Sequence, residues 1–191
     1  GGDFHFYQVD CGKLSGLSML GYGSLSGSYA GVWDTRGPSF HIDSKVERLN
    51  IHQGNVKDMK VAMTYETGKL DVMATVENEQ MQGGVLLAYD LSDSLNFLST
   101  RGQLRIDELA AFGLDIKGGQ EALETSFEII HAGQENKSFT NLSLTDFKYT
   151  CDTAIFTIDK ISMEDNQKGD HNTTTLKSDV VDLFISGNFR E

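Results

Sequence analysis

The chain has 191 residues, 39% of them hydrophobic and 23% charged, a composition that excludes an intrinsically disordered protein. Its formal net charge of −12 disfavours nucleic-acid phosphates and anionic membrane surfaces, since both bind positive fields. The 20 glycines stand beside a single proline, Pro38, which is typical of short strands joined by tight turns.

Apolar residues alternate with polar ones along most of the chain, beginning at Phe4 and Phe6. The clearest pattern runs from Val61 to Val76, where two alternating runs flank Glu66-Thr67-Gly68, and it predicts an antiparallel hairpin. Similar runs occur at Phe40 and Ile42; Val85, Leu87 and Tyr89; Leu104 and Ile106; Phe127 and Ile129; Leu142 and Leu144; Phe156 and Ile158; and Val181, Leu183, Ile185 and Phe189. Each strand would have one polar face toward solvent and one apolar face, which indicates an antiparallel sheet. The chain is long enough for about ten to fourteen such strands.

Helix signals are few. Asp107 is a candidate cap for a short helix over 108–112, which Gly113 ends, and residues 92–98 could form a helical turn. Residues 164–175 are the most polar stretch of the chain and predict a surface loop. We therefore expect little or no helix.

No pattern in the sequence indicates catalysis. The five histidines have no zinc-ligand spacing, and Lys168 occupies a ligand position in the calcium-like stretch 164–170. Ser26 replaces the third glycine of a dinucleotide-binding loop in residues 21–27. We expect no catalytic residue, metal or cofactor, and hence a protein that is not an enzyme.

The two cysteines, Cys11 and Cys151, lie 140 positions apart without a CxxC partner. Either one long-range disulfide or two buried free thiols fits this spacing. Neither a signal-peptide pattern nor an apolar run of about 18 residues occurs. Gly1 is the kind of residue that an expression tag leaves, and we interpret 1–191 as one β-rich segment of a longer protein.

Two phrases of the sequence carry a family resemblance. Residues 175–189 combine a strand, Ser178-Asp179, an aliphatic strand and Gly187-Asn188-Phe189, and residues 93–107 follow a similar plan. Both resemble TamB-like proteins of the Bacteroidetes envelope, part of the AsmA-like group.

The resemblance implies a long bacterial periplasmic protein anchored in the inner membrane. Its strands would curl into a half-pipe, or β-taco, whose apolar groove transports phospholipid between the inner and outer membranes and serves outer-membrane biogenesis. An outer-membrane barrel of the Omp85 type is the implied partner. A segment cut from such a sheet has open strand edges, so an edge-to-edge homodimer is expected.

In this interpretation the apolar stripes line the groove and contact acyl chains, through Val61, Met63, Leu70, Val72, Val76, Val85, Leu87, Leu104, Ile106, Phe127, Ile129, Phe156, Ile158, Leu183 and Ile185. The alternative is a β-sandwich in which the same residues form a closed core. Such a secreted or surface domain would bind glycan or protein, with Trp33, Tyr22 and Tyr29 as an aromatic platform. A hydrolase on a β scaffold is a third reading.

Overall fold

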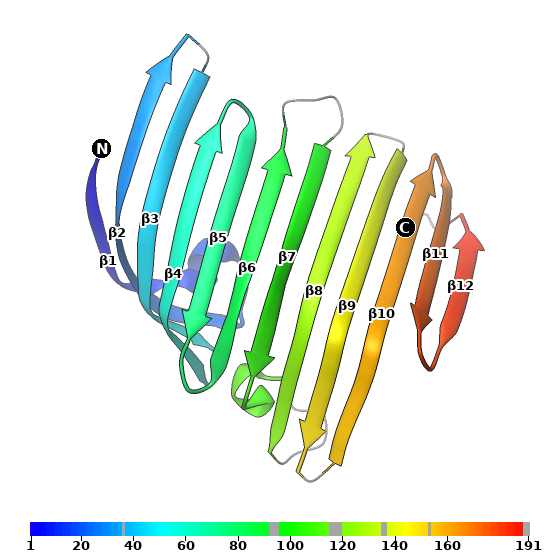
Figure 1. Ribbon diagram of the computed structural model, residues 1–191. Coiled ribbons are helices and arrows are strands. Elements are labelled where there is room, and N and C mark those ends of the chain that lie inside the picture. Colours follow the sequence, from blue (N-terminus) through cyan, green and yellow to red (C-terminus); the bar gives the residue numbers. More distant parts are fainter. Residues whose placement is uncertain (36, 92–95, 115–119, 135–136, 153, 189–191) are drawn as a thin grey trace.

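The computed structural model describes residues 1–35, 37–91, 96–114, 120–134, 137–152 and 154–188, and they form one long sheet (Figure 1). Its strands are β1 (Gly2–Asp10), β2 (Leu20–Asp34), β3 (Gly37–Ile51), β4 (Gly54–Glu66), β5 (Lys69–Glu77), β6 (Met81–Asp90), β7 (Asn96–Ile106), β8 (Glu121–Gln134), β9 (Lys137–Cys151), β10 (Ala154–Lys168), β11 (His171–Ser178) and β12 (Asp182–Gly187).

The twelve strands lie in the order of the chain, and each pairs antiparallel with the next. The prediction of an all-β, antiparallel sheet with little helix is confirmed. The β-sandwich alternative is wrong, because every described strand belongs to this single open sheet. Most of the connections are turns of two to five residues, so each strand returns beside its predecessor; the longer connections carry α1 and η1.

The hairpin predicted over 61–76 is confirmed as β4 and β5, with Met63 opposite Val72. Thr67 and Gly68 form its turn with φ of 49° and 81°. Two successive left-handed residues make the kind of turn whose twist matches that of the flanking strands.

The surface loop predicted over 164–175 is wrong. β10 continues to Lys168 and β11 begins at His171, and Glu164 lies opposite Thr175 in their ladder. Gly169, with φ of 62°, is one of only two residues left for the turn. Polar side chains lie on both faces of this long hairpin, so the composition of the segment is that of a surface loop although its backbone forms two strands.

Two short helices lie at one end of the sheet, called here the lower end. The 3-10 helix η1 (Leu109–Phe112) confirms the predicted helix in position, but Asp107 does not cap it and instead accepts a hydrogen bond from Arg105 Nε at 2.8 Å. The helix α1 (Cys11–Ser15) was not predicted, although Asp10 caps its start and Gly16 ends it in the left-handed region. Of the predicted turn over 92–98, residues 96–98 belong to β7 and 92–95 lie outside the described residues, as does Phe189.

The small buried core lies around η1. Leu109 and Phe112 of η1 pack with Val56 of β4 and Ile106 of β7, and partly buried residues from Leu49 of β3 to Tyr149 of β9 surround them. Six strand spacings of about 4.8 Å would separate β3 from β9 by about 29 Å in a flat sheet. The sheet therefore bends around η1, and in Figure 1 the lower parts of β1 to β4 sweep behind the other strands.

Bulges accompany this bend. Gln8, Asp58 and Asp146 have positive φ within strands, and the register shifts beside Gln8 and beside Asp146. A bulge adds a residue, increases the local twist and shifts the alternation of side chains by one. Residues on either side of each bulge can thus keep their apolar side chains on one face.

The rest of the sheet has no second layer. The chain exposes 12621 Å², whereas a compact monomer of 21.1 kDa would expose roughly 9,000 Å². The excess comes from a sheet open on both faces away from η1. Within the described ranges no helix has the length and apolar character needed to cross a membrane.

Candidate functional site

Directly opposed residues of an antiparallel pair have their side chains on the same face. One ladder row therefore crosses the sheet on a single face, from Ile42 through Met63, Val72 and Leu87 to Ile129. The row continues through Leu142, Met163, Leu176 and Leu183. We call the face that carries this row, and against which η1 packs, the apolar face.

All fifteen residues predicted to line a groove lie on the apolar face. The registers place there Val61, Met63, Leu70, Val72, Val76, Val85, Leu87, Leu104, Ile106, Phe127, Ile129, Phe156, Ile158, Leu183 and Ile185. Ile106 is buried beside η1, and the other fourteen are partly or largely exposed. In the described chain η1 packs against this face, and Cys11 of α1 lies against it at Gly23.

Ile161, Met163 and Leu176 share this face but were absent from the prediction. Asp159 lies at an irregular point of β10 opposite Asp146, so Ile158 and Ile161 share a face although three positions separate them. The strict alternation of apolar and polar residues is interrupted at such a point. The signal in the sequence that could have revealed this is a pair of aliphatic residues three positions apart, Ile158 and Ile161, with Asp159 between them.

Charge is sharply divided between the two faces. Every Lys and Arg of the described strands lies on the opposite face, called the polar face: Lys45, Arg48, Lys57, Lys60, Lys69, Arg101, Arg105, Lys137, Lys148, Lys160, Lys168 and Lys177. Apart from the bulge positions, the apolar face has two carboxylates in these strands, Asp165 and Glu121. A face without cations cannot bind an anion by charge, but it can contact hydrocarbon.

Glu121 is the most buried side chain of the described chain, at 2% exposure. Its Oε1 accepts a hydrogen bond from the Tyr149 hydroxyl at 2.7 Å, and Cys151 Sγ lies 3.9 Å away. The hydrogen bond to Glu121, followed by burial, raises the pKa of Tyr149 well above its usual value. The cluster ties the lower ends of β8 and β9 together.

Cys11 and Cys151 are not joined by a disulfide, so the disulfide alternative is wrong. Cys11 lies in α1 and Cys151 ends β9, eight strands further along the sheet. In the part of the chain that the structure describes, no three His, Cys, Asp or Glu side chains converge as metal ligands.

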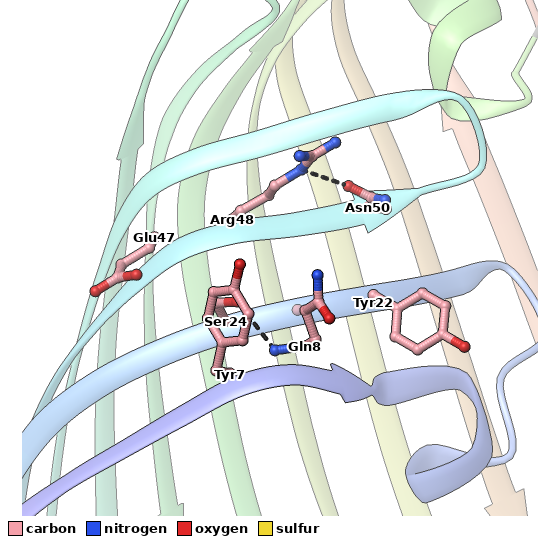
Figure 2. Close-up of a pocket in the computed structure, with 8 residues that line it drawn as sticks. Tyr7, Gln8, Tyr22, Ser24, Glu47, Arg48 and Asn50 are labelled. Carbon is pink, nitrogen blue, oxygen red and sulfur yellow. Dashed lines mark hydrogen bonds between the residues drawn. The ribbon is translucent and has the colours of Figure 1, made fainter.

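The polar face has a hollow of about 450 Å³ over the lower parts of β1 to β3 (Figure 2). Tyr7 and Tyr22 line it, with 69% and 57% of their surfaces exposed. Arg48 Nε donates to Asn50 Oδ1 at 3.1 Å, and the Gln8 backbone N donates to Ser24 Oγ at 3.2 Å. The hollow combines two aromatic rings with polar groups.

The structure does not assemble the predicted aromatic platform. Trp33 and Tyr29 lie on the apolar face, since Trp33 pairs with Pro38 and Tyr29 with Ile42. Tyr22 pairs with Asp10 and faces the other way. Eleven residues of extended strand also separate Tyr22 from Trp33, about 36 Å.

Fold and faces together define an all-β protein with a single open sheet, one face of which is apolar and, in the described chain, open to solvent away from its lower end. No family model, no curated protein and no solved structure matches the chain.

Proposed function

We propose that the chain is a non-enzymatic periplasmic segment of a TamB-like or AsmA-like envelope protein, and that its apolar face carries phospholipid acyl chains between the inner and outer membranes. One observation carries the proposal. An apolar face whose described strands carry no Lys or Arg extends over twelve strands, and the described helices cover it only at its lower end.

The energetics suit this role. Each CH₂ removed from water contributes roughly 0.8 kcal/mol, so a face that is several strands wide can hold an acyl chain without specific contacts. Charged side chains on the polar face keep the sheet in solution. In the full-length protein, an inner-membrane anchor would hold one end of the lipid path at the inner membrane, and an Omp85-type barrel partner would hold the other end at the outer membrane.

Neighbouring residues on opposite faces provide the test. Val72→Asp and Leu87→Asp place a charge on the apolar face, whereas Met73→Asp and Leu86→Asp place the same charge on the polar face, where 49% and 42% of the native side chains are exposed. We expect the first pair to reduce strongly the phospholipid that copurifies from a bacterial host, measured by native mass spectrometry after lipid extraction.

The second pair should retain the phospholipid. Equal lipid content in all four variants, each with a native circular dichroism spectrum, would contradict the proposal. A lipid-free wild-type chain would contradict it as well.

A second candidate function is saccharide binding at the hollow of Figure 2, favoured by its two exposed rings and by the neighbouring opposite charges of Glu47 and Arg48. Because these two charges offset each other, the site has little net charge and suits a neutral, hydroxyl-rich ligand. Tyr22→Ala should then abolish binding on a glycan array, while Tyr29→Ala, on the other face, should not. An array without signal for the wild-type chain removes this candidate.

A further inference from the structure

The apolar face changes character at the upper end of β8 to β11, opposite η1. One ladder row here consists of His131, Thr140, Asp165 and Thr174, all on the apolar face. We call these four residues the polar margin. His131 Nδ1 lies 2.8 Å from Thr140 Oγ1, and the Thr174 hydroxyl donates to Asp165 Oδ1 at 2.6 Å.

Position near the turns does not explain the polar margin. The same row, followed across β3 to β7, carries Phe40, Tyr65, Leu70, Tyr89 and Leu98. Phe40 and Tyr65 stack there with ring centroids 5.2 Å apart. Along this row the polar residues are thus confined to β8 to β11, whereas β3 to β7 carry apolar and aromatic residues.

The polar margin offers acceptors rather than cations. Asp165 is a carboxylate on a face that has no Lys or Arg in the described strands. Asn172 is one row higher and diagonal to Asp165, and its Oδ1 is buried without a hydrogen-bond partner. Asp165 therefore favours a positively charged N–H donor, and the oxygen of Asn172, whose Cβ lies about 7 Å away across the strands, adds to the acceptor character of this end of the face.

We infer that the polar margin binds the headgroup of the phospholipid, and that it selects a primary amine, as in an ethanolamine headgroup. A primary ammonium has three N–H donors and a positive charge, and it can donate to the carboxylate of Asp165. A choline headgroup has none, and a glycerol headgroup has no positive charge for Asp165. The inference rests on the proposed function, because the headgroup position assumes acyl chains on the apolar face.

The path of the acyl chains follows from the rows below. Leu142, Met163 and Leu176 come next, and Leu144 and Ile161 follow them. Rows are separated by two residues, about 6.7 Å. The apolar length from Leu142 to Tyr149 is then about 23 Å, more than the roughly 15 Å of one membrane leaflet's hydrocarbon.

The experiment uses the 191-residue chain and vesicles with equal amounts of ethanolamine, choline and glycerol phospholipids that share the same acyl chains. The chain is separated from the vesicles and its bound lipid is quantified by mass spectrometry. We expect ethanolamine lipid to be enriched, and Asp165→Asn to reduce that enrichment roughly tenfold, because a hydrogen bond to a charged group is lost.

Glu164→Gln is the matched control, since it removes the same charge from the neighbouring residue on the polar face. It should leave the enrichment unchanged, and Asp165→Glu should largely retain it. Bound lipid without headgroup preference, or a preference that survives Asp165→Asn, would overturn the inference and leave the proposed function standing. A chain that binds no lipid would overturn both.

Discussion

At the scale of single residues, the buried carboxylate of Glu121 makes the sharpest prediction. Tyr149→Phe removes the hydroxyl that donates to it, leaving a buried acceptor with one partner fewer. We expect the midpoint of thermal unfolding to fall by roughly 2 to 6 °C, measured by calorimetry. Tyr65→Phe, on the same face, serves as the control and should change the midpoint much less.

The same pair predicts a pH dependence. The folded pKa of Tyr149 is raised, so its contribution to stability is complete below the unfolded value near 10 and is lost as pH rises through the folded pKa. In an ultraviolet difference titration of the wild-type chain against Tyr149→Phe, the additional tyrosine should ionise above its usual pKa. An additional ionisation at the usual value would contradict the raised pKa.

Gly54 is required where β4 meets η1. A Cβ at this position would lie 2.6 Å from Phe112 Cε1, whereas at Gly84 the nearest atom, Thr75 Cγ2, would be 3.6 Å away. Gly54→Ala should therefore lower the free energy of unfolding by about 1–3 kcal/mol, and Gly84→Ala should be neutral or slightly stabilising. Chemical denaturation of both variants checks this difference.

At the scale of elements, the strands followed from alternation and the helices did not. The alternation of apolar and polar residues predicted the hairpin at Met63 and Val72, because successive side chains of a strand point to opposite faces of the sheet. It could not predict the bulge at Asp146, because a single inserted residue leaves the composition unchanged. The cap pair Asp10 and Gly16 was visible in the sequence, but one turn of helix is too short for a periodic signal.

The helix η1 is the element on which the lower core depends. Phe112 is 4% exposed and contacts the core from within the bend of the sheet. Phe112→Ala should lower the free energy of unfolding by about 3–5 kcal/mol and increase hydrogen exchange at the lower ends of β3 and β4. Phe97→Ala, whose side chain is 40% exposed on the polar face, should cost much less.

At the scale of the whole molecule, the sheet ends in two unprotected edges. Neither β1 nor β12 contains Lys, Arg or Pro, the residues that commonly block edge pairing. Twelve alternating strands give β1 and β12 opposite directions, so β12 of one copy can pair antiparallel with β1 of another. That arrangement would place Leu183 near Phe4 and continue the apolar face.

We therefore expect concentration-dependent association in sedimentation velocity, in which head-to-tail pairing does not stop at a dimer. Phe184→Lys places a cation on the β12 edge strand, where the native side chain is 66% exposed, and should weaken association. Met73→Lys, on a central strand, should not. Association of equal strength in both variants would show that the edges are not the contact.

Alternation in the sequence predicted the all-β class and the approximate number of strands, and the family resemblance implied a curved sheet, but the position of the bend around η1 could not be predicted. Leu49 and Tyr149 are 100 positions apart and pack around one helix only because the five strands between them curve. The residues of the apolar face were largely predictable, because each strand alternates apolar and polar side chains. The polar margin was not, because Asp165 and Thr174 fell in a stretch whose polarity resembled a loop.

Strand order that equals chain order also has a consequence for how the molecule forms. Every strand finds its partner across the turn that precedes it, apart from the longer connections at α1 and η1, so almost no distant segments need to meet. The sheet can grow from one end as the chain is made, one hairpin after another. At each stage the last strand provides a complete template for the next, and removing β11 and β12 should shorten the sheet without unravelling the rest.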